Sequence, residues 1–269
     1  MIEMEGNISV FKHKIEVVCQ KKVELIEESF WRYAARSAYA GAFLTMTTAV
    51  GAIAGDKLNH IDHNLGKFAF AFLFAWGLIY ILFLNSELAT SNMLYLTAGV
   101  YHKRLSIKKA VYILSTCTLF NLIGALITGW MFNQASAFQG FTDHSMIVEI
   151  VEGKLGKSSP TILWEAILAN MFINVAIMSF ILIKESGAKI AIVLSAIFMF
   201  VFFGLDHVIA NFASFSLAIF NAFAGTDGLT FLNTIRQWTF AYIGNYIGGG
   251  LLIGLVFAWL NNSKTSYLD

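Results

Sequence analysis

Long apolar stretches separated by short polar segments dominate the chain. Six of them reach the roughly 20 predominantly apolar residues that one helix needs to cross the hydrocarbon core of a bilayer. They cover residues 32–54, 67–98, 109–132, 162–184, 188–222 and 236–261. The pattern therefore predicts an all-α membrane protein with six transmembrane helices.

A shorter stretch ahead of the first span also has helical periodicity. Apolar side chains recur with Lys and Glu between them, at Phe11, Ile15, Val18, Cys19, Val23 and Ile26. This spacing is typical of an amphipathic helix. We expect residues 1–30 to form a cytoplasmic amphipathic helix and residues 31–269 to form the membrane domain. The helix would serve as an anchor at the membrane surface or move against the cytoplasmic end of the domain.

Two of the six stretches, 67–98 and 188–222, are interrupted by polar residues. The first contains the island Asn85 to Asn92, and the second contains the island Asp206 to Asn211. A charged residue at the centre of a bilayer costs at least about 2.5–3.5 kcal/mol on insertion scales. The islands therefore predict discontinuous helices whose polar breaks face a protected interior.

The two halves of the membrane domain also match each other. The matched positions are Glu87 with Asp206, Asn92 with Asn211, Asn121 with Asn245, and Gly124 with Gly248. Each half, about 31–132 and 160–261, has three spans, so the second half must lie inverted in the membrane. Inverted repeats with broken helices at matching positions indicate a transport pathway near the midplane.

Composition and charge agree with a membrane location. The chain is 57% hydrophobic and 13% charged, with a formal net charge of +1. These values exclude a disordered chain and a nucleic-acid binder and disfavour a soluble enzyme. With the N-terminus inside, 13 of the 18 Lys and Arg residues, Lys264 among them, fall in cytoplasmic segments. This bias predicts a multi-pass protein of the cell membrane with both termini in the cytoplasm.

Four motifs resemble those of the formate/nitrite transporter family. They are Glu87-Leu88-Ala89-Thr90-Ser91-Asn92, Gly204-Leu205-Asp206-His207-Val208-Ile209-Ala210-Asn211, Ile167-Leu168-Ala169-Asn170 and Gly244-Asn245-Tyr246-Ile247-Gly248-Gly249-Gly250. The resemblance covers all six spans. It implies an aquaporin-like helical fold, a homopentamer with one pore per protomer, and passage of small monovalent anions or their conjugate acids, often with protons.

The resemblance also assigns roles to residues at matching motif positions. The family's central histidine falls on His207, its break-loop threonine on Thr90, its lysine on Lys154 and its last-helix asparagine on Asn245. Its apolar constrictions are similar to Phe74, Leu78, Leu88, Ile173 and Phe200. Two positions depart from the family, because Ala89 stands where formate channels often have Phe, and Asp206 stands where Glu is common.

His207 carries the chemistry that we expect at the midplane. It is the only one of the six histidines that lies in a span. A neutral imidazole can donate a hydrogen bond to an anion, and a protonated one can deliver a proton. A helix–helix hydrogen bond is the structural alternative for this residue. We further expect Thr90 to bind the anion and Asp206 to influence His207.

The other polar candidates have both transport and structural interpretations. Lys154 would concentrate anions at the outer mouth, with Lys157 as a competitor for that role. Glu87, Asn170, Asn211 and Asn245 complete the predicted pathway, and the three asparagines suit backbone carbonyls that a break leaves free.

The sequence thus predicts a channel or transporter, and not an enzyme. Formate, linked to a proton through His207, is the expected substrate, with nitrite, hydrosulfide, lactate and acetate as alternatives. An aquaporin-type pore is disfavoured because the single proline, Pro160, excludes paired Asn-Pro-Ala boxes. An intramembrane metalloenzyme is disfavoured because His60-Ile61-Asp62-His63, the only metal-ligand cluster, falls in a hydrophilic outer loop. We expect no metal and no cofactor.

Overall fold

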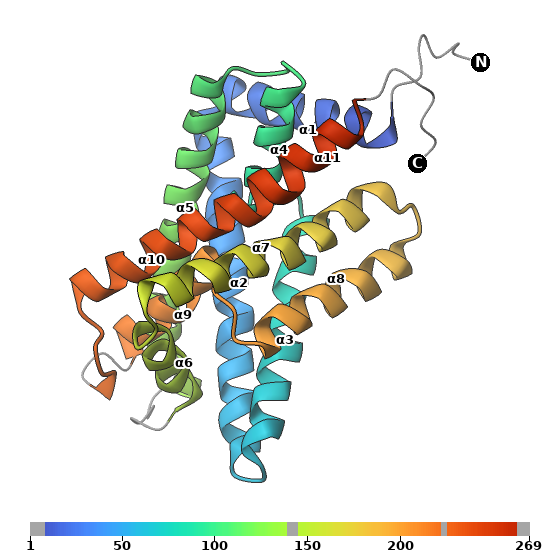
Figure 1. Cartoon of the computed structure of the whole chain (residues 1–269). Coiled ribbons are helices and arrows are strands. Elements are labelled where there is room, and N and C mark those ends of the chain that lie inside the picture. Colours follow the sequence, from blue (N-terminus) through green and yellow to red (C-terminus); the bar gives the residue numbers. More distant parts are fainter. Residues whose placement is uncertain (1–8, 139–144, 222–224, 263–269) are drawn as a thin grey trace.

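The computed structural model describes residues 9–138, 145–221 and 225–262, and all its regular elements are helices (Figure 1). Five helices in these ranges are long and apolar enough to cross a membrane. They are α2 (Phe30–Asn59), α3 (His63–Phe83), α5 (Ile107–Asn133), α7 (Ser159–Leu182) and a C-terminal helix that combines α10 (Phe231–Asn245), the π-helical stretch η3 (Tyr246–Leu255) and α11 (Val256–Leu260). The predicted stretch 188–222 forms two shorter apolar helices, α8 (Ser186–Phe202) and α9 (Val208–Asn221).

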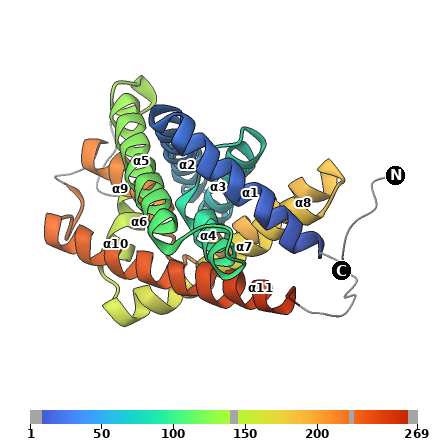
Figure 2. The same cartoon turned by 90° about the horizontal axis from the view of Figure 1, so that it is seen from above.

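The predicted amphipathic helix is α1 (Val10–Glu28), which lies across one end of the bundle (Figure 2). Its N-terminus is capped by the side chain of Ser9, which accepts a hydrogen bond from the backbone of Lys12. Buried side chains recur every three or four residues along one face, at Phe11, Ile15, Cys19, Lys22 and Ile26. This helix therefore packs its apolar stripe on the membrane helices, and the stripe includes one lysine.

Both predicted helix breaks are present, and they have the same local structure. Helix α3 ends before Asn85, and α8 ends before Gly204; both residues have positive φ, 53° and 70°. In each case the next amide donates to a carbonyl five residues earlier, Ser86 to Ile81 at 2.9 Å and Leu205 to Phe200 at 3.1 Å. This pattern is a Schellman termination, which needs a left-handed residue. After it, α4 (Ala89–Tyr101) and α9 resume the helical path.

A short helix that the apolar pattern does not predict, α6 (Met146–Leu155), lies at the opposite end from α1. Its first amide, that of Met146, donates to the side chain of Asp56 near the end of α2. Helix α6 also packs on α9 and α10. A single turn, η1 (Ser136–Phe138), follows α5. Below, the two ends of the bundle are called the α1 end and the α6 end.

Glycines allow two pairs of long helices to approach closely. An added Cβ on Gly124 of α5 would lie 1.9 Å from the carbonyl oxygen of Ala38 on α2. An added Cβ on Gly248 would lie 2.1 Å from the carbonyl oxygen of Ile167 on α7. Small residues at such crossings are characteristic of helix packing in membranes. The crossings hold α2 against α5, and α7 against the C-terminal helix.

Candidate functional site

Thr90 and His207 meet at the centre of the molecule. The hydroxyl of Thr90 lies 2.7 Å from Nε2 of His207, although the two residues are 117 positions apart. Both side chains are buried. Thr90 is the second residue of α4, and His207 immediately precedes α9. The N-terminal ends of the two half-helices therefore meet at this contact, and helix N-termini carry partial positive charge.

The hydrogen bonds of His207 define the form of its ring. Nδ1 accepts a hydrogen bond from the backbone N–H of Ala210 at 3.1 Å, as the side chain of an N-cap residue does. A ring nitrogen that accepts cannot carry the proton, so a neutral His207 has its proton on Nε2. Nε2–H then donates to Thr90, whose own hydroxyl hydrogen stays available for another acceptor.

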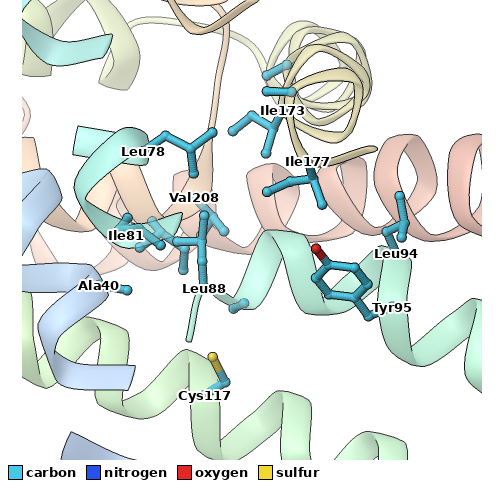
Figure 3. Close-up of a cluster of buried hydrophobic side chains, with 14 of the residues drawn as sticks. Ala40, Leu78, Ile81, Leu88, Leu94, Tyr95, Cys117, Ile173, Ile177 and Val208 are labelled. Carbon is cyan, nitrogen blue, oxygen red and sulfur yellow. The ribbon is translucent and has the colours of Figure 1, made fainter. Parts of the chain in front are cut away.

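Apolar side chains enclose this pair. The ring of Phe200 lies 5.9 Å from the ring of His207, and Phe74 lies 6.1 Å beyond Phe200, measured between ring centroids. Leu78, Leu88 and Ile173 belong to the same buried cluster, which Figure 3 shows. Each of the five predicted constriction residues is at most 3% exposed. The surroundings of the polar pair are therefore dry.

A cavity lies on each side of this enclosed centre. The cavity at the α6 end has a volume of about 350 Å³, and Phe74 and Phe200 contribute to its lining. The cavity at the α1 end has a volume of about 490 Å³, and Leu88 contributes to its lining. Thr90 and His207 line neither cavity. The apolar side chains therefore separate the central pair from both cavities.

A buried ion pair lines the cavity at the α1 end. The ammonium of Lys22 on α1 lies 2.6 Å from Oε2 of Glu87 in the first break. Oε2 also accepts from the amide of Asn92 at 3.1 Å and from the hydroxyl of Tyr33 at 3.5 Å. A carboxylate this buried needs such partners. The N-terminal helix thus supplies the cation for the first break.

A larger ion cluster surrounds Asp206 at the other end. Lys154 lies 2.9 Å from Oδ1 of Asp206, and Lys157 lies 3.0 Å from Oδ2. Oδ1 also accepts from Asn211 at 3.1 Å and from Gln237 at 2.8 Å. The carboxylate has no solvent exposure. Because these partners take up both oxygens, Asp206 can influence the adjacent histidine through its field and its backbone.

The two lysines of this cluster, which precede α7, differ electrostatically. Burial lowers the pKa of Lys154, although Asp206 opposes the shift. Burial also disfavours the charge on Lys157, but Asp206 and Glu165 outweigh it, so the pKa of Lys157 is raised. Lys157 is therefore the more firmly charged of the two.

An asparagine from another helix holds each break open. Asn121 accepts from the amide of Ala89 at 2.9 Å and donates to the carbonyl of Glu87 at 2.8 Å. Asn245 accepts from the first amide of α9 at 2.8 Å and donates to the carbonyl of Asp206 at 3.0 Å. The matched sequence positions therefore make matched contacts. The inverted relation of the two halves remains a prediction from the sequence.

The formate/nitrite transporter family profile matches residues 12–259. The chain belongs to this family. It is therefore an integral membrane transport protein, and the resemblance of its four motifs is confirmed.

Two solved structures and one curated relative resemble this transporter over most of its length. The uncharacterized transporter YwcJ of Bacillus subtilis (strain 168) is 24% identical over 248 residues, which cover 92% of this chain and 96% of YwcJ. A structure described as an FNT family ion channel has a TM-score of 0.84 at 21% identity and covers 93% of this chain and 98% of its own. A pentameric formate channel with formate bound has a TM-score of 0.72 at 18% identity and covers 87% and 98%. These structures have the fold of this transporter.

The predicted pathway residues of the transporter fall into two groups. The first group gathers at the centre and consists of His207, Thr90 and the five constriction residues. Asn170 belongs to this group, because it donates to the carbonyls of Asn245 at 2.7 Å and Thr90 at 3.4 Å. The second group belongs to the ion clusters near the two ends, with Glu87 at the α1 end and Asp206, Lys154 and Asn211 at the α6 end. Asn170 and Asn245 donate to backbone carbonyls, whereas Asn211 donates to the side chains of Asp206 and Gln237.

Sequence reasoning missed four polar residues that complete these clusters, and one of them, Glu165 on α7, pairs with Lys157. Lys22 interrupts the apolar stripe of the amphipathic helix, and a charged residue on a buried face is a usable signal. Gln237 is a polar residue inside an apolar span. Arg236 donates to the carbonyls of Leu155 at 2.7 Å and Lys157 at 2.9 Å, so it fixes the end of α6 and the loop that carries Lys157. No sequence pattern indicates that contact.

The candidate metal cluster gains no support from the geometry. Among the residues that the structure describes, no three His, Cys, Asp or Glu side chains lie close enough to hold a metal ion. Asp62 caps α3 by accepting from the amides of Asn64 and Leu65. The side chain of His63 lies outside the described part.

Proposed function

We propose that this transporter conducts small monovalent anions, formate first among them, together with a proton, along a path past Thr90 and His207. The observation that carries the proposal is the dry Thr90–His207 contact between two cavities. A known formate channel with the same fold supports formate as the substrate. The transport changes no bond of the anion other than the O–H bond of its acid form.

The charges at the α6 end suit the first step of transport. Lys154 and Lys157 line the cavity there and attract an anion. The apolar side chains beyond the cavity penalise a bare anion far more than a small neutral acid, because a charge loses its hydration in a dry constriction. Passage therefore requires that the anion be neutralised or held by hydrogen bonds at the centre.

Thr90 and His207 can supply both functions. The free hydroxyl hydrogen of Thr90 donates to the anion, and Nε2–H of a neutral His207 becomes a second donor when the anion replaces the Thr90 oxygen as its acceptor. For proton transfer, a proton that enters with the anion as hydronium is taken up at Nδ1, and the imidazolium gives its Nε2 proton to formate, which becomes formic acid. The ring is then neutral with its proton on Nδ1, and exchange of that proton to Nε2 restores the starting tautomer. Protonated Nδ1 would face the N–H of Ala210, which is also a donor, so the imidazolium is short-lived and the ring returns to its neutral form.

We further propose the arrangement of the transporter in the cell. It lies in the cell membrane with both termini and the α1 end in the cytoplasm, as the distribution of Lys and Arg favours. It assembles as a homopentamer with a path in each protomer, as the pentameric formate channel with the same fold supports. Nitrite, hydrosulfide, lactate and acetate are the alternative substrates, and the small side chain of Ala89 favours a substrate at least as large as formate.

The test is formate flux into proteoliposomes as a function of pH. We expect His207→Phe to reduce flux at least about tenfold, because it removes both donor and proton carrier, a loss within the usual contribution of acid–base groups. His207→Asn keeps a donor but does not titrate, so flux should continue with a weakened pH dependence. His102→Asn, at the end of α4, is the matched control and should behave like the wild type.

The proposal fails if His207→Phe retains the wild-type rate and pH profile. A panel of formate, nitrite, hydrosulfide, lactate and acetate in the same vesicles identifies the preferred substrate.

A further inference from the structure

Glu165 forms an ion pair with Lys157 inside the cavity at the α6 end. Glu165 stands in the second turn of α7, and both side chains line the cavity of about 350 Å³. The carboxylate oxygen Oε2 is within hydrogen-bond distance of the ammonium of Lys157. The two side chains are 26% and 20% exposed, so water and small solutes in the cavity can reach both.

The ammonium of Lys157 has a full set of acceptors. Besides Glu165, it donates to the carbonyl of Gly204 at 2.8 Å and to Oδ2 of Asp206 at 3.0 Å. An ammonium has three N–H groups, so no donor of Lys157 is left for a passing anion. Glu165 is the acceptor that can be displaced, because Gly204 contributes backbone and Asp206 is fully buried.

The buried carboxylate does not depend on Glu165. Asp206 keeps Lys154, Asn211 and Gln237 as partners when Glu165 moves. The backbone of Lys157 is fixed separately, because Arg236 binds its carbonyl. Glu165 can therefore leave Lys157 without dismantling the ion cluster, and its departure exposes one N–H group toward the cavity.

We propose that Glu165 is a tethered competitor, which occupies with its own carboxylate the place on Lys157 where a small monovalent anion would bind. A side-chain carboxylate and a carboxylate substrate offer the same charge and the same acceptor oxygens to the ammonium. Glu165 thereby sets the apparent affinity of the cavity for the incoming anion. This inference rests on the proposed function, because it assumes that the cavity admits anions.

The effect of Glu165 on anion binding to Lys157 can be estimated. A ligand on a short flexible tether acts at an effective concentration in the millimolar range. A free anion that binds Lys157 must exceed that concentration to displace Glu165. Removal of the carboxylate should strengthen anion binding by a factor of one plus the ratio of this effective concentration to the intrinsic Kd of a carboxylate for Lys157, which is about five- to tenfold when the ratio is about four to nine.

The experiment is calorimetric titration of sodium formate into the purified full-length protein in detergent. Glu165→Gln keeps the shape of the side chain but makes it a much weaker acceptor, so the Kd for formate should fall about five- to tenfold. The double variant Glu165→Gln with Lys157→Met should lose this gain. Glu165→Asp, which keeps the charge but shortens the side chain by one methylene, is the second variant and should give part of the gain.

A charge-matched control distinguishes the direct contact between Glu165 and Lys157 from the general effect of a negative charge in the cavity. Glu149 lines the same cavity, so Glu149→Gln removes one negative charge from it at another place. We expect the control to strengthen binding by less than twofold. The inference is wrong if no variant binds formate more tightly, if Glu149→Gln matches Glu165→Gln, or if the gain persists without Lys157.

Formate flux measured in parallel keeps the two proposals apart. A wild-type protein that carries no anion refutes the proposed function, and the titration still decides whether Glu165 competes for Lys157.

Discussion

At the scale of single residues, one asparagine stabilises each helix break by hydrogen bonds to backbone groups. Asn245 makes three contacts with backbone groups, to the first amide of α9 and to the carbonyls of Ala166 and Asp206. Asn121 has the same arrangement, with the carbonyl of Ser37 as its third partner. The amides of Ala89 and Val208 and the carbonyls of Glu87 and Asp206 are freed by the breaks, and the third partner of each asparagine belongs to an unbroken helix. An amide is suited to the position because it both donates and accepts.

We expect Asn245→Ala to destabilise the protein by at least about 2 kcal/mol, because a buried polar group left without a partner costs roughly 1–3 kcal/mol. Asn174→Ala is the matched control, since Asn174 is also buried but donates to one carbonyl of its own helix, that of Asn170. The midpoint of thermal unfolding in detergent should fall by roughly 5 °C or more for Asn245→Ala. Equal midpoints for the two variants would contradict this role of Asn245.

At the scale of helices, an ion pair joins the amphipathic helix α1 to the first break between the membrane helices. The stripe of α1 buries Lys22, which reaches Glu87 in the first break. The same helix is also held by packing, for example between the rings of Phe11 and Phe257 at 6.1 Å. Glu87 faces the cavity at the α1 end, so water can reach the carboxylate when the lysine is absent. Loss of α1 would therefore change the charge at this mouth more than the stability of the bundle.

Deletion of residues 1–28 should alter the dependence of formate flux on pH and leave assembly intact. Lys22→Met should reproduce this change, because it also leaves the carboxylate of Glu87 without its cation. Lys21→Met removes a neighbouring charge that lines the same cavity and should have no such effect. The measurement is flux against pH in proteoliposomes, with size-exclusion chromatography to check assembly. If deletion and Lys22→Met both leave the curve unchanged, α1 is only an anchor.

At the scale of the whole molecule, the outer surface exposes large apolar side chains. Trp31, Trp164 and Phe231 are 74%, 67% and 78% exposed in the single chain. Large apolar side chains exposed to this degree on membrane-spanning helices are expected to be covered by lipid or by other subunits. The Thr90–His207 contact, by contrast, lies inside one chain. On the proposed path past His207, we expect each protomer of an assembly to act alone, without a pore shared on the symmetry axis.

We expect a particle with five times the 29.8 kDa mass of one chain when the detergent-solubilised protein is measured by native mass spectrometry. Pentamers assembled from mixed wild-type and His207→Phe chains should transport formate in proportion to the wild-type fraction, because each path is independent. A steep, cooperative loss of flux with the first few variant chains would instead indicate one pore shared on the symmetry axis.

The sequence by itself determined the helices and the places where they break. Apolar length defines the spans, the Lys and Glu pattern of residues 11–30 defines α1, and the polar islands define the breaks, because each of these properties is local. It also placed Thr90 and His207 in the two polar islands. Local pattern could not show that the two side chains touch, since 117 positions separate them and only the packing of α4 against α9 brings them together.

Tertiary structure decided which charges meet. Lys22, Gln237 and Glu165 come from three different helices, and nothing in their local sequence indicates that Glu87, Asp206 or Lys157 is the partner. The ring nitrogen of His207 that carries the proton is likewise set by its two partners, the amide of Ala210 at Nδ1 and the hydroxyl of Thr90 at Nε2. A buried charge must find a partner wherever the fold provides one, so pairing depends on the arrangement of all helices and not on the spacing within any one of them.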